Sequence, residues 1–268
     1  MYLCDCHTHT QVSPDSQAPL SAMVRAAADA GLSTLYVTDH CDLVDRNGTP
    51  VTSFDWPAAR IQFHAVRVPD GLTLRLGLEL GSAPYDPEIA RRILAEGGDE
   101  LDFVLGSLHN WLGIRENHDL CYTRFEDPAL CRLAVDHCLT NTWALVTRCP
   151  DCYDSLAHII YPLRYIQRDG NRVDLADYEE RVRAILTEVA RTGHAMEVNT
   201  NRGRSLADWI PLLRWYQECG GTMVTVGSDA HCPEDMAKGI PAALELLREA
   251  GFPHVTTFEK RRPVLHKI

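Results

Sequence analysis

Eight residues that commonly bind metal ions occur in short motifs spread along the whole chain. They are His7, His9, His40, Glu79, His109, His158, Asp229 and His231. On an ideal strand, two residues that are separated by one other residue point the same way, so His7 and His9 can hold one ion, and Asp229 and His231 repeat this spacing. Imidazole nitrogen suits zinc, iron and manganese, and a carboxylate can bridge two cations and offset their repulsion. Each motif alone is weak evidence, but the whole set predicts a metal centre.

The predicted strands explain how residues so far apart in the sequence could meet. Short apolar runs bounded by turn residues indicate buried parallel strands. These runs are 2–6, 34–38, 72–80, 101–105, 155–160, 195–198 and 223–226. Helical periodicity lies between several of them, at 20–30, 129–145, 177–191 and 206–219. Roughly seven strand–helix units are near the size of a (β/α) barrel, although an open doubly wound sheet would alternate in the same way. In a barrel, the metal-binding residues would lie where the strands end, on one rim.

Composition limits the class of protein. With 268 residues and 45% hydrophobic content, the chain is predicted to form one domain over 1–268. Its 26 basic and 37 acidic residues give a net charge of −11, which argues against partners such as nucleic acid or an anionic membrane. An anionic substrate is still compatible, because bound cations dominate the local field. The N-terminus lacks a basic, apolar leader, so a cytoplasmic protein with ordinary thiols is expected. The charged run at 259–262 is expected to be a solvated end.

The motifs match, in order, those of a known family. They are His7-Thr8-His9, Thr38-Asp39-His40, Gly77-Leu78-Glu79, Gly106-Ser107-Leu108-His109, Ala157-His158 and Gly227-Ser228-Asp229-Ala230-His231. With them the chain resembles the PHP (polymerase and histidinol phosphatase) superfamily over nearly its whole length. Its length, its Glu197-Val198-Asn199-Thr200 strand end and its Leu163-Arg164-Tyr165 segment are most similar to the monofunctional histidinol-phosphatases. The resemblance implies a single-domain, distorted (β/α)7 barrel with three divalent metal ions, which could be Zn, Mn or Fe, on its C-terminal rim.

The resemblance also implies a role for each ligand. One metal ion would be held by His7, His9, Glu79 and Asp229, and Glu79 would bridge it to a second ion held by His109 and His158. The third ion would be held by Asp15, His40 and His231, and because position 15 is His in some relatives, this site is more oxygen-rich here. Asp39 is placed behind the ligands. The implied nucleophile is a hydroxide that bridges two metals. Catalysis is assigned to Glu79, Asp229 and His231, and the leaving-group acid, either His231 or a metal-bound water, stays open.

Substrate binding is assigned to three residues beyond the metal ligands. Arg164 would bind phosphate, Arg202 would assist it with Arg204 as a competitor for that role, and Asn199 would orient the loop or the ligand. The preferred function is hydrolysis of L-histidinol phosphate in histidine biosynthesis, which makes the partner a small phosphorylated molecule. Alternatives are a PHP phosphodiesterase, exonuclease or nucleotide phosphatase, and a phosphotyrosine phosphatase. A non-catalytic metal-binding module is disfavoured, since its ligand set would not need to be complete. The oligomeric state is left open.

Overall fold

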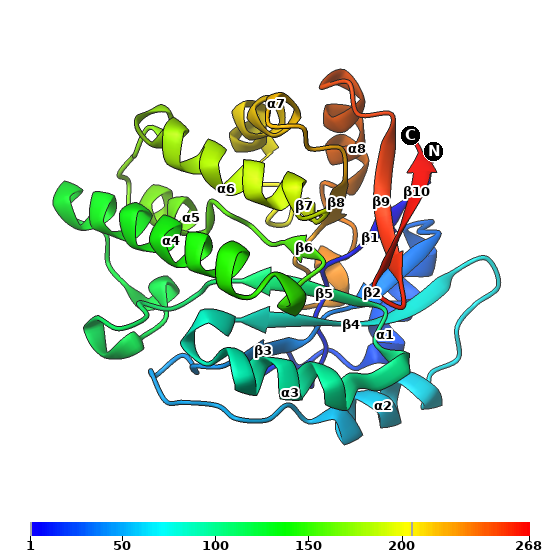
Figure 1. The fold of residues 1–268 in the computed structure, drawn as a ribbon. Coiled ribbons are helices and arrows are strands. Elements are labelled where there is room, and N and C mark those ends of the chain that lie inside the picture. Colours follow the sequence, from blue (N-terminus) through cyan, green and yellow to red (C-terminus); the bar gives the residue numbers. More distant parts are fainter. Residues whose placement is uncertain (1, 205) are drawn as a thin grey trace.

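Seven parallel strands form a nearly closed barrel in the computed structural model, which describes residues 2–204 and 206–268 (Figure 1). The strands are β1 (Cys4–Asp5), β2 (Thr34–Val37), β4 (Thr73–Gly81), β5 (Phe103–Ser107), β6 (Ser155–Leu156), β7 (Ala195–Asn199) and β8 (Val224–Gly227), hydrogen-bonded in this order. The ring closes between its first and last strands, where the Cys6 amide donates to the Val226 carbonyl over 2.9 Å. The predicted (β/α)7 barrel is therefore confirmed, and the doubly wound alternative is wrong.

A further short strand, β3 (His40–Asp42), pairs in parallel with the end of β4. The sequence analysis had no strand here. In this register His40 lies beside Glu79, and Asp42 lies beside Gly81. The pairing brings the His40 motif directly against Glu79, at the carboxyl end of the barrel.

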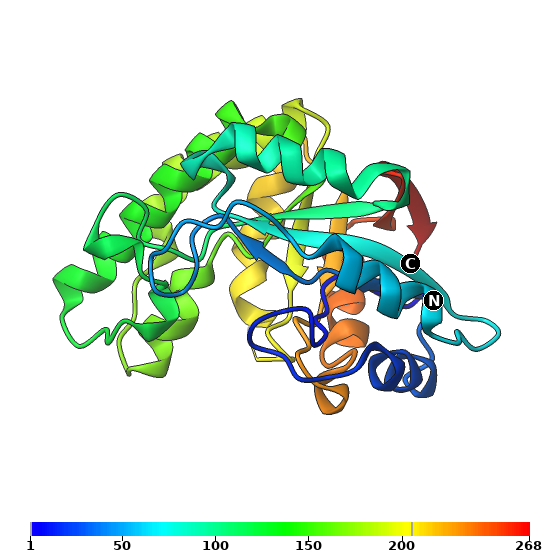
Figure 2. The same ribbon diagram turned by 90° about the horizontal axis from the view of Figure 1, so that it is seen from below.

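Within the described part of the chain, eight α-helices surround the barrel (Figures 1 and 2). They are α1 (Leu20–Asp29), α2 (Trp56–Ala65), α3 (Pro87–Gly97), α4 (Pro128–Arg148), α5 (Tyr161–Arg168), α6 (Glu179–Arg191), α7 (Trp209–Glu218) and α8 (Ile240–Glu249). Two of them begin with an Asp-Pro pair, in which Asp86 and Asp127 accept hydrogen bonds from the first turn and proline occupies the first helical position. Among the described residues, no helix combines the length and the apolar character needed to cross a membrane.

The chain ends in an antiparallel hairpin of β9 (His254–Glu259) and β10 (Arg262–Lys267) beside the barrel (Figure 1). Its turn contains the charged run that we expected to be solvated. The Lys260 and Arg261 amides donate to Asp102, and the Arg261 guanidinium pairs with Asp154. Glu259, Lys260 and Arg262 are exposed, as expected of a solvated segment. Asp102 and Asp154, which precede β5 and β6, nevertheless anchor the turn to the barrel.

Candidate metal centre

All nine predicted metal ligands gather at the carboxyl ends of the strands. His7 and His9 follow β1, His40 begins β3, Glu79 lies in β4, His109 follows β5, His158 follows β6, and Asp229 and His231 follow β8. Asp15 reaches the same place from the loop between β1 and α1. The barrel thus brings together side chains that lie more than 200 residues apart in the sequence.

Glu79 lies at the centre of this cluster and is completely buried. Its Oε2 lies 3.1 Å from His7 Nε2 and 3.5 Å from His9 Nε2. Its Oε1 lies 2.8 Å from His158 Nε2 and 3.2 Å from His109 Nε2. Oε2 also lies 2.8 Å from His40 Nδ1. Each oxygen of the carboxylate therefore faces a different set of histidines, which is the arrangement expected of a ligand that bridges two cations.

The remaining predicted ligands complete two of the groups. Asp229 Oδ1 lies 3.5 Å from His9 Nε2 and 3.8 Å from His7 Nε2. Asp15 Oδ2 lies 3.1 Å from His231 Nε2 and 3.6 Å from His40 Nε2. These contacts are compatible with the first and third predicted groups, and His40 Nδ1, 2.8 Å from Glu79 Oε2, shows that the groups adjoin.

The atoms that face the interior of the cluster fit metal ions better than they fit each other. His7 Nε2, His9 Nε2, His40 Nδ1 and Glu79 Oε2 are buried and lack a well-directed hydrogen bond among the described residues. An unpaired buried polar group is costly, so four of them facing one point need an explanation. Ligand atoms about 2.1 Å from a tetrahedral cation lie about 3.4 Å apart. The separations of 3.1, 3.5, 3.5 and 3.8 Å in this group agree with that value.

A buried carboxylate, Glu197, and a partly exposed one, Asp42, hydrogen-bond the Nδ1 atoms of two of the histidines. Glu197, in β7, accepts from His7 Nδ1 over 2.6 Å, and Asp42, in β3, accepts from His109 Nδ1 over 2.8 Å. These hydrogen bonds place the proton on Nδ1 and turn Nε2 toward the centre, as in many metal sites. Glycine makes room for both acids. A Cβ at Gly227 would lie 2.5 Å from Glu197 Oε1, and one at Gly81 would lie 1.6 Å from Asp42 Oδ1.

The sequence analysis gave neither carboxylate a role, although each left a signal. Glu197 is a charged residue within the apolar run of a buried strand, where an acid needs a partner. Asp42 follows His40 at the two-residue spacing that we used only for the other motifs.

Opposite charges shift the pKa values of the cluster in opposite directions. Burial opposes a charge on His7, but the carboxylates of Glu79, Glu197 and Asp229 outweigh it and raise its pKa well above the usual range. Burial likewise opposes a charge on His109, but Asp42 and Glu79 raise its pKa to about 10. Burial would raise the pKa of Glu79, but the surrounding histidines hold it well below the usual range. Without metal, His7 and His109 are therefore positively charged at pH 7, with a proton on both ring nitrogens.

We expect metal binding to release protons, because a histidine must be neutral to coordinate a cation. Since the pKa of His109 is raised to about 10, cation and proton compete at pH 7, and zinc affinity should rise with pH up to that value. Calorimetric zinc titrations at pH 7 in two buffers of different ionisation enthalpy measure the protons released. Equal heats in both buffers would mean that no proton leaves, contrary to this prediction.

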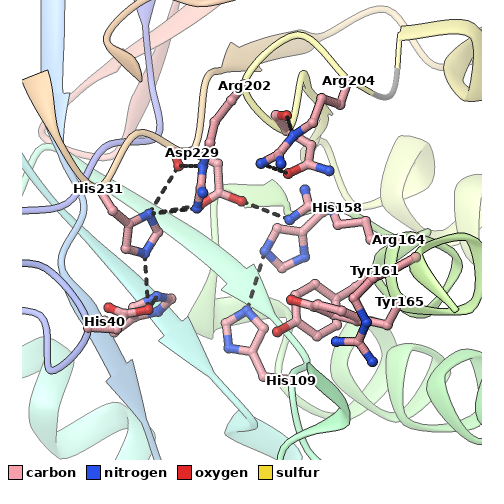
Figure 3. A pocket seen from close by; sticks show the side chains of 13 residues that line it. His40, His109, His158, Tyr161, Arg164, Tyr165, Arg202, Arg204, Asp229 and His231 are labelled. Atoms are coloured by element: carbon pink, nitrogen blue, oxygen red, sulfur yellow. Dashed lines mark hydrogen bonds and ion pairs between the residues drawn. The ribbon is translucent and has the colours of Figure 1, made fainter. Parts of the chain in front are cut away.

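An open cavity of about 250 Å³ lies directly over the centre. Arg164, Arg202 and Arg204 line it together with four of the predicted ligands, His40, His109, His158 and His231 (Figure 3). Arg164 is nine-tenths buried and donates from Nη1 to Asp229 Oδ2 over 2.8 Å. Its Nη2 is buried and has no hydrogen-bond partner among the described residues. One arm of the guanidinium fork beside the cavity is therefore unpaired.

The other predicted substrate residues lie in different surroundings. Arg202 lies close to the ligands, with Nε 3.3 Å from the Asp229 carbonyl and Nη2 3.5 Å from His231 Nδ1. Arg204 is exposed and donates to the Asn201 carbonyl. Asn199 is fully buried, and its amide lies within 3.4 Å of Glu197 and Asp229. This position suits an amide that orients the ligands and the loop.

Comparison with known proteins agrees with this geometry. The sequence model of the PHP domain matches residues 5–201. The chain belongs to the PHP family. A probable histidinol-phosphatase from Clostridium acetobutylicum is 28% identical over 96% of this chain and 97% of its own length. The histidinol-phosphatase of Lactococcus lactis is 26% identical over 95% of this chain and 93% of its own.

Solved structures of PHP proteins share the fold. The histidinol phosphate phosphatase of Lactococcus lactis, in complex with zinc, L-histidinol and phosphate, superposes with a TM-score of 0.77 at 22% identity and covers 98% of both chains. A putative histidinol phosphatase from Listeria monocytogenes has a TM-score of 0.72 at 17% identity, covering 89% of this chain and 99% of its own. At these identities the structural likeness establishes the fold, and the function has to be argued from the site.

Proposed function

We propose that this PHP protein is a histidinol-phosphatase, which hydrolyses L-histidinol phosphate to L-histidinol and phosphate. One observation carries the proposal. The predicted cation centre lies between Arg164, whose Nη2 is unpaired among the described residues, and an acidic cavity. A substrate with an anionic phosphate and a cationic leaving group matches both sides. The similarity to histidinol-phosphatases along almost the whole chain supports the same assignment.

The acidic cavity adjoins the centre and has a volume of about 530 Å³. Its lining contains five aspartates, Asp15, Asp42, Asp45, Asp55 and Asp119, against Arg46, His40 and His109. Asp15 and Asp42 already pair with His231 and His109, so Asp45, Asp55 and Asp119 supply most of the remaining negative charge. Such a wall favours an ammonium or imidazolium group, and it repels the phosphates of a nucleotide or the carboxylate of a phosphotyrosyl amino acid. Charge complementarity therefore favours histidinol phosphate over the two alternative substrate classes.

The protein's own groups would divide the work of hydrolysis. Three divalent cations, held by the three predicted ligand groups, would neutralise the phosphate oxygens and activate the attacking water. Arg164 Nη2 would hold a phosphate oxygen, and its guanidinium fork suits this geometry. The ring of Tyr161, with its centroid 5.6 Å from the guanidinium carbon, would support Arg164 from one face.

We propose that Glu79, Asp229 and His231 act through cation binding. His231 Nδ1 lies 3.0 Å from the Asp229 carbonyl, which can only accept, so a proton on Nδ1 would leave Nε2, 3.1 Å from Asp15 Oδ2, to coordinate a cation. A nitrogen that coordinates a cation cannot also donate a proton to the leaving group. This argument disfavours His231 as the leaving-group acid.

The test is hydrolysis of a substrate panel by zinc- or manganese-loaded protein. The panel contains L-histidinol phosphate, phosphotyrosine, a nucleoside monophosphate and bis(p-nitrophenyl) phosphate. We expect kcat/KM to be highest for histidinol phosphate by at least about 100-fold, the range that a lost charge-assisted contact gives. A preference for the diester or the nucleotide would be compatible with the proposed metal centre, but it would contradict histidinol phosphate as the substrate.

Asp119 offers a sharper test of the acidic cavity. Its Oδ1 accepts from the Cys121 amide over 2.7 Å and from the Tyr161 hydroxyl over 3.3 Å, and burial raises the pKa of its carboxyl. We expect Asp119→Asn to raise KM for histidinol phosphate by about 10-fold or more, because one charge-assisted contact is lost. The rate with p-nitrophenyl phosphate, whose leaving group has no positive charge, should hardly change.

The matched control is the exposed Asp70, which lines neither cavity. Asp70→Asn should leave both substrates unaffected. An equal loss with both substrates in Asp119→Asn would indicate a general disturbance of the site and contradict a role in recognising the leaving group.

A further inference from the structure

The buried hydroxyl of Ser13 lies where the β1–α1 loop meets the start of β3. Its Oγ lies 2.7 Å from Asp39 Oδ1, 3.1 Å from His9 Nδ1 and 3.0 Å from the His40 amide nitrogen. One hydroxyl thus contacts the imidazole of one predicted ligand and the backbone of another.

The hydrogen bonds around Asp39 have a defined direction. Asp39 Oδ1 accepts from the Thr10 amide over 2.6 Å, and its Oδ2 accepts from the Thr10 hydroxyl over 2.7 Å. The Thr10 oxygen also accepts from the Gln62 amide group over 2.6 Å and from the Val12 amide over 3.3 Å, so its proton points to Asp39. Asp39 is therefore surrounded by donors on both oxygens, as an ionised carboxylate requires.

Because Asp39 acts as an acceptor, the donor and acceptor roles of the Ser13 hydroxyl are determined as well. A hydroxyl has one proton and two lone pairs. The Ser13 proton goes to Asp39, and one lone pair accepts the His40 amide, which can only donate. The second lone pair then remains for His9, so His9 must carry its proton on Nδ1.

The consequence appears on the other side of the same ring. His9 Nε2 is left with a bare lone pair, and it lies 3.5 Å from both Glu79 Oε2 and Asp229 Oδ1. Since His9 is completely buried, no water can correct a wrong tautomer there. Glu197 and Asp42 accept directly from Nδ1 of His7 and of His109. Nδ1 of His9 is instead linked to a carboxylate, Asp39, through the Ser13 hydroxyl.

We propose that Ser13 is a positioning residue, oriented by Asp39, that holds His9 in the tautomer needed to bind a cation and ties the His40 backbone to the same point. The inference rests on the cation centre of the proposed function, and it is independent of which phosphate ester is the substrate. Its test uses metal binding and the protonation of His9, so its failure is distinguishable from failure of the substrate assignment.

The first measurement is nitrogen-15 NMR of the imidazoles in the metal-free and zinc-loaded protein, with His9 assigned through a His9→Gln variant. We expect the metal-free His9 to carry its proton on Nδ1. A proton on Nε2 would overturn the proposal, because it would require a neutral Asp39 and a reversed hydrogen bond at Ser13.

The second measurement is zinc affinity by chelator competition for Ser13→Ala, Ser13→Thr and Ser33→Ala. We expect Ser13→Ala to weaken at least one zinc site by about 10–100-fold, the usual cost of losing a group that orients a ligand. Ser13→Thr keeps the hydroxyl and should restore most of the affinity. Ser33, which precedes β2, is the control, and its variant should bind like the wild type.

Wild-type affinity at every site in Ser13→Ala would refute the positioning role. If that variant fails to fold, as judged by circular dichroism, the tautomer of His9 in the wild-type protein still decides the question.

Discussion

Replacing Glu79 by glutamine is expected to remove at least one bound cation and to lower kcat/KM by roughly 10³-fold. The glutamine side chain has nearly the same shape, but it has one acceptor oxygen and no charge. In the native site Oε1 faces His109 and His158, and Oε2 faces His7, His9 and His40. Only one of these two sets can keep an oxygen ligand in Glu79→Gln, and the repulsion between two neighbouring cations is no longer offset.

Metal content by plasma emission spectroscopy and steady-state kinetics together measure this effect. Glu249 is an exposed residue at the end of α8, so Glu249→Gln is the matched control and should keep full metal content and activity. Thermal unfolding of the metal-free proteins separates a lost ligand from a lost fold. A Glu79→Gln protein that retains all its metal and its activity would show that this carboxylate does not bridge two cations.

Glu79 also shows which parts of the site could be predicted from sequence. Parallel strands end at one rim, so a polar residue at the end of a buried apolar run is placed there by topology alone. His109 and Asp229 were found by the same reasoning, and their positions needed no knowledge of loop conformation. The order and spacing of such residues predicted a metal site on one rim, whereas the (β/α)7 barrel and the assignment of ligands to three groups were implied by the resemblance to the PHP family.

What the sequence did not reveal depends on contacts between distant segments. The pairing of β3 with β4 brings Asp42 to His109. The sequence of neither strand indicates that the two strands pair. The hairpin turn is attached through Asp102 and Asp154, which carry no local sign of that role.

Helix α5 was missed for a different reason. Its eight residues, Tyr161–Arg168, are too few for a clear helical period. Yet Tyr161, Arg164, Tyr165 and Arg168 recur at helical spacing and all line the cavity over the centre. Of the four, Arg164 alone was assigned a role from the sequence. The spacing of all four residues predicts a helix that presents one face to the substrate.

Arg164 leads to the second large effect, because this residue is expected to bind the phosphate directly. Burial opposes its charge, but Asp229 raises the pKa of the guanidinium, so it stays cationic. In Arg164→Ala we expect kcat/KM for histidinol phosphate to fall by about 10²–10³-fold, as for other groups that stabilise developing charge. The inhibition constant of inorganic phosphate should rise at least about 10-fold, since phosphate loses the same contact.

Arg164→Lys distinguishes charge from geometry. Lysine keeps the positive charge, but it cannot hold Asp229 with one nitrogen and phosphate with another, so we expect only partial recovery of phosphate affinity. Arg168 is unsuitable as a control, since its guanidinium is bound by Asp169 and by the carbonyls of Cys121 and Thr123. The exposed Arg172 in the segment after α5 serves instead, and Arg172→Ala should behave as the wild type.

Metal content decides how a loss of activity in Arg164→Ala is interpreted, because Arg164 also contacts Asp229. Unchanged metal with weaker phosphate inhibition would assign the effect to the free Nη2 and to direct phosphate binding. Lost metal with unchanged phosphate inhibition would instead mean that Arg164 acts by orienting Asp229, and the phosphate would then have to be held by the cations and Arg202. The single unpaired nitrogen of Arg164, buried over the centre, favours the first outcome.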